Sequence, residues 1–456
     1  MLSTACREAV WDCVVVGGGV AGIAAATYLA DAGLRVLLLE KRPYLGGRAS
    51  SFANSKTGEL VDVCQHISLG CCTVFDSLLR RLGVEDRIRY LEKIDFSLPD
   101  GKRFELRSSP LPAPYHLLPS LLTFPGLSFR DRTSLAKLMG TTLRWARSAS
   151  GKWADEAPQS FGEACRRAGL ARRASDRLIS PTIVSACNAS PDEVDASYGF
   201  MVLYEVLCST RSGYRIGVPS EPLASIFTEP TCAFLEKRGS AVAVRTTVEH
   251  VQADGSERVV VRLKSGESVA ARQCVVAVPW YAVRMLLRED LLTEHQLACQ
   301  AALRPSPIVG VHYWFRNRVN CPPAVCLIGA TTHWVFNVQL NHGLNTGLGH
   351  LSAVVSADSR LASMPPEEVA LTVRRDIEDR LPEIRGQEVL VWRCAREQRG
   401  TFIPHPGVDA VRPGPQTRQP NILLAGDWIA TGWPSTMEGA ARSGLLTARH
   451  LLVANA

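Results

Sequence analysis

The sequence predicts an α/β fold in which a nucleotide-binding domain is assembled from both ends of the chain around an inserted α+β substrate domain. Three observations support this prediction. A glycine-rich turn between a short strand and a helix opens the chain, an apolar strand ending in a carboxylate follows it, and another strand with a glycine-rich loop precedes the last helix. Because nucleotides bind at the carboxyl ends of parallel strands, we expect both chain ends to meet at one sheet edge.

The composition is that of a globular protein with large cores. Of the 456 residues, 46% are hydrophobic and 21% are charged, which excludes intrinsic disorder, collagen and coiled coil. The length predicts about two or three domains. The net charge of +7 is too small for this length to indicate nucleic-acid binding, but it is compatible with an anionic membrane surface.

The 14 cysteines are scattered along the chain and predict reduced thiols in a cytoplasmic protein. Cys64, His66, Cys71 and Cys72 form a cluster of metal-ligand residue types. They lack the paired spacing of a zinc site, so we expect no metal.

Hydrophobic patterning places the first elements. Cys13–Val16 is a β-branched run, Ala21–Ala32 has the small residues of a helix packed on a sheet, and Leu34–Leu39 is a buried parallel strand. The uncharged run Cys13–Ala30 is nearly long enough to cross a membrane, but its consecutive glycines favour a strand, a turn and a helix. Phe75–Leu82 is predicted to be an amphipathic helix.

The rest of the chain supplies a second group of elements. They are, in order, a three-stranded meander at Ala241–Val251, Arg258–Leu263 and Ser268–Val278, a helix at Glu367–Leu381, a strand at Asn421–Asp427 and a last helix at Thr436–Leu452. We therefore expect five segments. Residues 1–105, 216–280 and 391–456 form the nucleotide-binding domain, and residues 106–215 and 281–390 form the substrate domain.

The first site motif is Gly17-x-Gly19-x-x-Gly22, at the turn from strand to helix. Its glycines allow a tight turn and a close backbone approach to a pyrophosphate, which the amides and the positive end of the helix would hold. Glu40 ends the next strand, where a carboxylate can accept hydrogen bonds from ribose hydroxyls, so FAD or NAD is favoured over NADP. The cofactor-binding residues predicted here are Gly17, Gly19, Val20, Ala21, Gly22 and Glu40.

The stretch after Glu40 favours FAD over NAD. Gly46 and Gly47 allow a second backbone approach to the cofactor, and Arg48 can neutralise a pyrophosphate. Lys41 and Arg42 flank the adenosine side. NAD-binding folds do not need this extension.

The C-terminal motif, Gly426-Asp427-Trp428, completes the predicted site. Asp427 can hold the ribityl hydroxyls of a flavin, and Ser435 or Thr436 can cap the last helix. The first amides of that helix, with Met437 and Glu438, would face the N1–C2=O edge of the flavin. That edge is negative in the reduced state, so the helix dipole favours reduction.

These three blocks, in this order, resemble the amine oxidase and phytoene desaturase superfamily of flavoproteins over essentially the whole chain. The resemblance implies a Rossmann-type FAD-binding domain of the p-hydroxybenzoate hydroxylase and amine oxidase type. It also implies that the strand around Val248 gives backbone contacts to adenine. Gln398–Phe402 contains no counterpart of the family's flavin-linking cysteine, so FAD is expected to be non-covalent.

Two further stretches, Val61–Thr73 and Thr401–Ala410, resemble the hydroxysqualene dehydroxylase family. This family usually has asparagine where the chain has Val63, so a hydrogen-bonding side chain is missing beside the proposed site. The resemblance implies reduction of hydroxysqualene to squalene in a hopanoid pathway, with hydride from flavin N5. The electron donor that reduces FAD is left unassigned.

The leaving hydroxyl needs a proton donor with a pKa near neutral. His66 is our first candidate, with Gln65 orienting the hydroxyl and Asp62 fixing either the loop or the histidine tautomer. The alternative is that Gln65 and His66 only hydrogen-bond the backbone and the flavin. His405 is a second candidate donor.

Such an isoprenoid substrate arrives from a bilayer. Leu117–Leu127, followed by Arg130, Arg132 and Lys137, is either an element that dips into one leaflet or an inward-packed helix of the inserted domain. We expect a cytoplasmic protein that associates peripherally with the inner face of the cytoplasmic membrane.

Two other functions are open at this point. A carotenoid or phytoene desaturase would run the redox reaction in reverse, and an amine oxidase would need an aromatic cage, which Trp392 and Trp433 could supply. Prenyl-lipid escort proteins have a similar fold but no chemistry, and they do not need intact flavin contacts.

Overall fold

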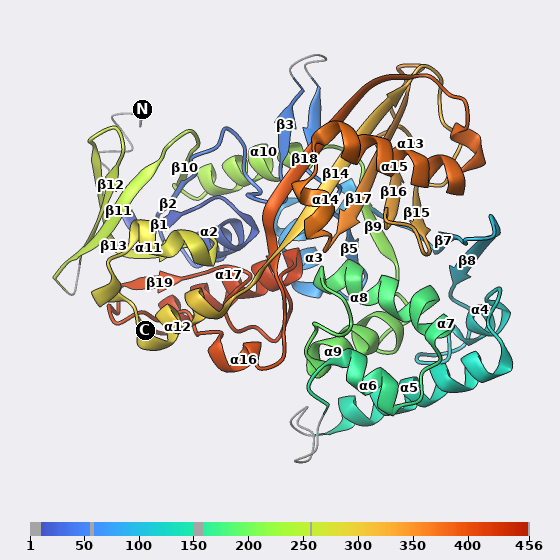
Figure 1. Ribbon diagram of the computed structural model, residues 1–456. Helices are drawn as coiled ribbons and strands as arrows, with labels where there is room; N and C mark the ends of the chain where they lie inside the picture. The colour runs from blue at the N-terminus through green and yellow to red at the C-terminus, as the bar shows by residue number, and fades with distance from the viewer. Residues whose placement is uncertain (1–10, 55–58, 149–157, 256–257, 455–456) are drawn as a thin grey trace.

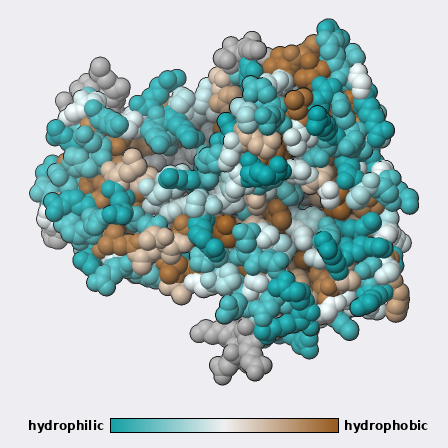
Figure 2. Space-filling view, in the orientation of Figure 1, coloured by the Kyte–Doolittle hydropathy of each residue, from teal (hydrophilic) through white to brown (hydrophobic). Residues whose placement is uncertain are grey.

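The computed structural model of the protein describes residues 11–54, 59–148, 158–255 and 258–454. Two β-sheets stand side by side, and a group of helices lies beneath the second sheet (Figure 1). The face shown in Figure 2 is largely hydrophilic, with hydrophobic residues gathered in small groups.

The first sheet runs in the order β10-β2-β1-β13-β12-β11, and β19 also pairs with β13. Its strands are β1 (Trp11–Val16), β2 (Val36–Leu39), β10 (Ala241–Ala243), β11 (Val248–Asp254), β12 (Arg258–Leu263), β13 (Ser268–Val276) and β19 (Ile422–Leu424). β1 and β19 flank β13 in parallel, so the two ends of the chain share one sheet. The β-branched and leucine-rich strands are almost wholly buried, as a covered parallel sheet requires.

The predicted meander is confirmed for β11, β12 and β13, which pair antiparallel in that order. The expectation of one strand over Ala241–Val251 is wrong. β10 pairs in parallel with β2, and the chain then turns at Arg245, whose φ is +55°, before β11 begins. Hydrophobic alternation carries across this turn, which is why the sequence did not indicate it.

Helices α2 (Val20–Asp31) and α17 (Met437–Ala454) pack against each other beside the first sheet. A Cβ at Gly444 would lie 2.3 Å from the carbonyl oxygen of Ala21, so only glycine permits this approach. β1 and α2 confirm that the run Cys13–Ala30 is a strand, a turn and a helix. Among the described residues, no helix combines the length and the apolarity needed to cross a bilayer.

The second sheet runs in the order β18-β14-β17-β16-β15-β7-β8. Its strands are β7 (Lys93–Ser97), β8 (Arg103–Arg107), β14 (Pro305–Phe315), β15 (Ala324–Leu327), β16 (Trp334–Asn337), β17 (Gly349–Ser356) and β18 (Val389–Phe402). Helix α15 (Pro366–Arg380) covers it through a separate hydrophobic core. β7 and β8 thus bring residues 93–107 to this sheet. The division of the chain into three nucleotide-binding and two substrate-domain segments stays a prediction.

Further helices and short strands complete the fold. The helices are α3 (Thr73–Leu82), α4 (Leu118–Thr123), α5 (Phe129–Arg147), α6 (Phe161–Arg167), α7 (Arg172–Ala174), α8 (Ser180–Cys187), α9 (Ala196–Leu207), α10 (Leu223–Glu236), α11 (Val283–Leu286), α12 (Glu294–Ala302), α13 (Val338–Asn341), α14 (Ser359–Ser363) and α16 (Val408–Val411). The short strands are β3 (Ser51–Ala53), β4 (Leu60–Asp62), β5 (Ser68–Leu69), β6 (Ile88–Tyr90) and β9 (Ile216–Pro219). α3 contains the predicted amphipathic helix and ends at Gly83, which is left-handed with φ +70°.

Candidate active site

A cavity of about 770 Å³ extends from the carboxyl edge of the first sheet to β16 and β17 of the second. Residues from both ends of the chain line it, as the nucleotide-site prediction requires. The predicted cofactor residues in its wall are Gly17, Gly19, Val20, Ala21, Glu40, Lys41, Arg42, Gly47, Arg48, Val248, Gly426, Asp427, Thr436 and Met437.

The turn between β1 and α2 has the geometry of a phosphate cradle. Gly17 has φ +107°, and a Cβ at Gly22 would lie 1.9 Å from the carbonyl oxygen of Gly17. Gly22 is outside the cavity wall, and its role is to let α2 begin directly against the turn. No side chain of the described residues caps α2 at Gly19, so the first amides of the helix are available to an anion.

Glu40 is buried and held at the end of β2. One carboxylate oxygen accepts from the amide of Gly18 at 2.7 Å, and the other accepts from the amide of Arg42 at 2.8 Å. Each oxygen keeps a second lone pair, so the carboxylate can still accept from ribose hydroxyls. Arg42 also donates to the carbonyl of Gly47 at 2.9 Å, which links this end of the site to the second glycine turn.

Arg48 and Asp427, predicted from opposite ends of the chain, are in direct contact. Nη2 of Arg48 lies 2.5 Å from Oδ1 of Asp427, and Nη1 donates to the carbonyl of Gly400 at 2.9 Å. Burial alone would lower the pKa of Arg48, but the adjacent Asp427 carboxylate raises it, so the guanidinium stays charged. Ser435 donates its hydroxyl to the other oxygen of Asp427.

Thr436, rather than Ser435, caps α17, because its hydroxyl accepts from the amide of Gly439 at 3.1 Å. Glu438 does not line the long cavity. Its two oxygens accept from the amides of Val74 and Phe75 at 3.1 and 2.7 Å, and it pairs with Arg442. The Glu438 carboxylate therefore caps α3, while the expected contact of its region with the flavin stays a prediction.

Gln65 and His66 line the long cavity, as predicted. Nδ1 of His66 lies 2.8 Å from the carbonyl oxygen of Cys64, which fixes Nδ1 as the protonated nitrogen of the neutral ring. Nε2 is then the nitrogen left to meet a substrate. Burial lowers the pKa of His66 below 6.5, and the charge of Arg48 lowers it further, whereas the contact with Cys64 opposes both.

Asp62 does not orient His66. Its Oδ1 accepts from the hydroxyl of Ser51 at 2.6 Å and from the amide of Leu223 at 2.9 Å, at the start of α10. Burial raises the pKa of Asp62 to about 6. Of the two roles expected for Asp62, these contacts support anchoring of the loop, while the carbonyl of Cys64 sets the tautomer of His66.

A smaller, apolar chamber of about 130 Å³ adjoins the long cavity. Its walls come from α3, α8, α9, β7 and β16, and most of the residues in them are hydrophobic. Six residues border both spaces, namely Ile67, Ser185, Ala186, Trp334, Thr436 and Met437. The chamber therefore opens beside the start of α17, where the flavin ring is expected.

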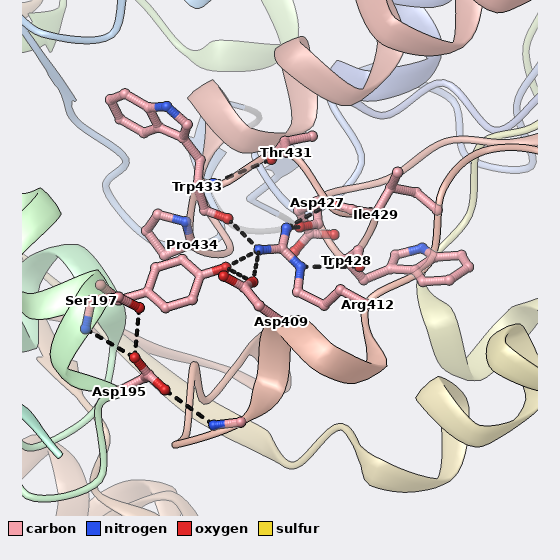
Figure 3. A network of polar contacts seen from close by, with 12 residues as sticks. Asp195, Ser197, Asp409, Arg412, Asp427, Trp428, Ile429, Thr431, Trp433 and Pro434 are labelled. Carbon is pink, nitrogen blue, oxygen red and sulfur yellow. Dashed lines mark hydrogen bonds and ion pairs between the residues drawn. The ribbon is translucent and has the colours of Figure 1, made fainter. Parts of the chain in front are cut away.

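The loop that carries Asp427 is organised by a buried arginine, Arg412, that the sequence did not indicate (Figure 3). The Arg412 side chain is 0% exposed. Its guanidinium donates to four loop carbonyls, those of Asp427 at 3.0 Å, Trp428 at 3.3 Å, Ile429 at 2.6 Å and Trp433 at 2.9 Å. One side chain thus fixes the loop that precedes the cap of α17.

Arg412 also reaches the helices beneath the second sheet. It donates to the hydroxyl of Tyr198 on α9, and that hydroxyl donates to Asp409 at 2.5 Å. Asp195, the N-cap of α9, accepts from the amide of Gly407 at 3.0 Å. Nothing local to Arg412 marks it as special in sequence, because its partners are distant carbonyls.

Two other sequence-based candidates, His405 and Trp392, lie outside both cavities. His405 contacts the carbonyl of Pro406, and Trp392 packs against the core of the second sheet. Cys64 borders the long cavity, but burial raises the pKa of its thiol to about 12. Within the described ranges, no group of histidine, cysteine and acidic side chains could hold a metal.

The chain is similar to known proteins over nearly its whole length. The family described as flavin containing amine oxidoreductase matches residues 20–452. A hydroxysqualene dehydroxylase of Rhodopseudomonas palustris is 28% identical over 96% of this chain and 98% of its own. A 15-cis-phytoene desaturase of Solanum lycopersicum is 24% identical over 97% of this chain and 77% of its own. A structure of putrescine oxidase bound to putrescine has a TM-score of 0.73 at 17% identity, covering 98% and 99% of the two chains.

We predict that Arg412→Met will release FAD and destabilise the protein, because several buried carbonyls lose their donor. The expected loss is about 3 kcal/mol or more in the free energy of unfolding. Urea denaturation and the flavin content after gel filtration measure the two effects. Arg418→Met, which removes a half-exposed arginine from the same segment, is the matched control and should change stability by less than about 0.5 kcal/mol. Retention of FAD by the Arg412 variant would contradict this role.

Proposed function

The chain belongs to the family of flavin-containing amine oxidoreductases, and on that premise we propose that it reduces hydroxysqualene to squalene with non-covalently bound FAD. The observation that carries the proposal is the apolar chamber that opens beside the predicted flavin position. An isoprenoid with a single hydroxyl needs such a space, because its chain has no polar groups to satisfy.

The residues present fit FAD. The glycine cradle at Gly17 and the amides of α2 suit a pyrophosphate, Glu40 suits a ribose, and the capped start of α17 suits the anionic edge of a reduced flavin. When bound, FAD in its reduced form would supply the hydride. The high pKa of the Cys64 thiol keeps it unreactive, in line with non-covalent binding.

His66 is proposed to give the leaving hydroxyl its proton, and Gln65 to orient that hydroxyl. In the protonated ring, Nδ1–H keeps its bond to the carbonyl of Cys64, and Nε2–H is free to donate into the cavity. The hydroxyl then leaves as water. The proton donor therefore stands in the wall of the same cavity that would hold the cofactor.

The alternatives have less support. The aromatic cage that amine oxidation would need does not form, because Trp392 lies outside both cavities. An escort protein would not need the contacts among Arg48, Asp427 and Gly400 that shape the long cavity. A desaturase would need a substrate that gives up hydride. Parallel assays with hydroxysqualene, phytoene and simple amines distinguish dehydroxylase, desaturase and amine oxidase activity.

We predict that His66→Ala will keep FAD but will lower the rate of squalene formation by about 10²–10⁴-fold, as expected for loss of a general acid. Single-turnover assays with pre-reduced enzyme measure the chemical step. His405→Ala is the matched control, since this histidine lies outside both cavities, and its rate should equal that of the wild type. Activity of His66→Ala within about tenfold of the wild type would show that another group is the acid.

The pH dependence should report the same histidine. The donor must be protonated, and the pKa of His66 is lowered from 6.5. The single-turnover rate should therefore rise as the pH falls below 6.5 and decline as the pH increases through the pKa. Single-turnover rates of the wild type and of His66→Ala, measured from about pH 5 to about pH 9, test this. The rate of the variant should not show this decline with increasing pH. The same decline in the variant would mean that a different group titrates.

We further propose that the protein docks on an anionic membrane through a patch around α4. Leu118 and Leu122 lie one helical turn apart and are 43% and 54% exposed, and Phe129, at the start of α5, is 81% exposed. Arg130 and Lys137, on the same helix as Phe129, are also exposed. Such a combination of apolar and basic groups favours an interfacial position.

The structure modifies the sequence-based expectation for this segment. Leu117, Phe124 and Leu127 are buried, so only part of Leu117–Leu127 faces outward. Arg132 donates to the carbonyls of Leu122 and Phe124, so it stabilises the patch instead of contacting lipid.

We predict that Leu122→Glu with Phe129→Glu will abolish co-sedimentation with vesicles of anionic phospholipid while leaving the fold intact. The reason is the cost of burying two carboxylates beside acyl chains. Leu371→Glu is the matched control, because Leu371 is 56% exposed on α15 and should leave binding unchanged. Equal binding by both variants would remove the patch from the interface.

A further inference from the structure

Trp334 occupies a special position between the two cavities. It is the one aromatic residue among the six that border both the long cavity and the apolar chamber. None of those six residues carries a formal charge. A substrate carbon placed to receive hydride at this junction would therefore lie against Trp334. Two carboxylates, Glu205 and Glu438, line the chamber outside this group of six, and Glu438 is already engaged by the amides of Val74 and Phe75 and by Arg442.

The indole of Trp334 is held in a fixed orientation. Its Nε1–H donates to the hydroxyl of Ser185 on α8 at 2.8 Å, and that hydroxyl donates to the carbonyl of Pro181 at 2.6 Å. The ring also stacks with Phe336 at 5.9 Å between centroids and 16° between planes. Because its only polar hydrogen is engaged, Trp334 offers the junction a π surface and no hydrogen-bond donor.

We infer that Trp334 is a catalytic residue that stabilises positive charge on the substrate carbon as its hydroxyl departs; this rests on the proposed function. The hydroxyl accepts a proton, the C–O bond breaks with its electron pair leaving in water, and the carbon becomes an allylic cation. Hydride supplied by the reduced cofactor would then form the C–H bond, which would reduce the carbon and oxidise the cofactor. An electron-rich indole face attracts a cation most strongly where water is excluded.

Every other aromatic residue in the walls borders only one of the two spaces: Phe75, Phe96, Tyr214 and Trp433 line the chamber, and Tyr281 and Phe336 line the long cavity. Trp433 borders only the chamber, and the guanidinium of Arg442 already lies 4.6 Å from its ring centroid. Phe336 borders only the long cavity and has a weaker π face than an indole. The assignment therefore falls on Trp334 and on its support by Ser185.

The test compares two probes that need no turnover. N,N-dimethylfarnesylamine is an ammonium ion at neutral pH, and its hydrocarbon isostere carries CH in place of nitrogen. The wild-type holoenzyme should bind the ammonium probe about 10–30-fold more tightly than the isostere. Trp334→Leu should abolish this preference, and Trp334→Phe should keep part of it. Trp433→Leu, the matched control, should leave the ratio of the two affinities unchanged.

A second measurement ties the role to the reaction. With hydroxysqualene, Trp334→Leu should lower the single-turnover rate by about 30-fold and change KM little, because the charge exists only during the chemical step. An unchanged ratio of probe affinities in Trp334→Leu would overturn the inference. If that variant does not retain FAD, an unchanged ratio in Trp334→Phe would overturn it.

The two proposals fail in different ways. If the wild type does not convert hydroxysqualene, the proposed function is wrong. If it still prefers the ammonium probe and Trp334→Leu does not, the cation-stabilising role of Trp334 survives that failure.

Discussion

The buried guanidinium of Arg412 is the interaction on which the organisation of the site depends. It donates hydrogen bonds to carbonyls of the loop from Asp427 to Trp433. This loop places Asp427 against Arg48 and leads into Thr436 at the start of α17. A buried charge is costly unless its donors are all engaged, and here backbone carbonyls, a tyrosine hydroxyl and a partly exposed carboxylate engage them. Its contact with Tyr198 also joins α9, a wall of the apolar chamber, to the loop at the cofactor end.

The molecule thus divides its chemistry between two spaces. The long cavity has backbone amides, a ribose-type carboxylate and the Arg48–Asp427 pair, which suit a charged cofactor. The chamber has hydrophobic walls, which suit an isoprenoid chain. Trp334 and Ile67 border both spaces, and His66, the proposed proton donor, precedes Ile67 in the wall of the long cavity. This arrangement explains how one active site can handle a strongly polar cofactor and an almost wholly apolar substrate.

The sequence predicted the features that depend on local physics. The tight turn at Gly17 and Gly22 is confirmed, because it leaves no room for a Cβ, and Glu40 follows a buried strand as expected. The sequence could not indicate contacts with remote partners, such as the Glu438 carboxylate at the start of α3 and the Asp62 carboxylate at the start of α10. Arg412 and Trp334 were missed for the same reason. The role of Arg412 depends on distant carbonyls, and the role proposed for Trp334 depends on the hydroxyl of Ser185 and on the two cavities. Only the fold brings these groups together, so no spacing along the chain indicates them.

The placement of β19 and α17 has a consequence for synthesis. The central strand β13 needs β19 as its second parallel neighbour, and α2 needs α17 against its small residues. β19 and α17 come much later in the chain than β1 and α2. During synthesis the first-made strand and helix therefore keep an uncovered face until these partners have emerged. The walls of the cofactor pocket come together only then, so flavin can be loaded only after β19 and α17 have been made.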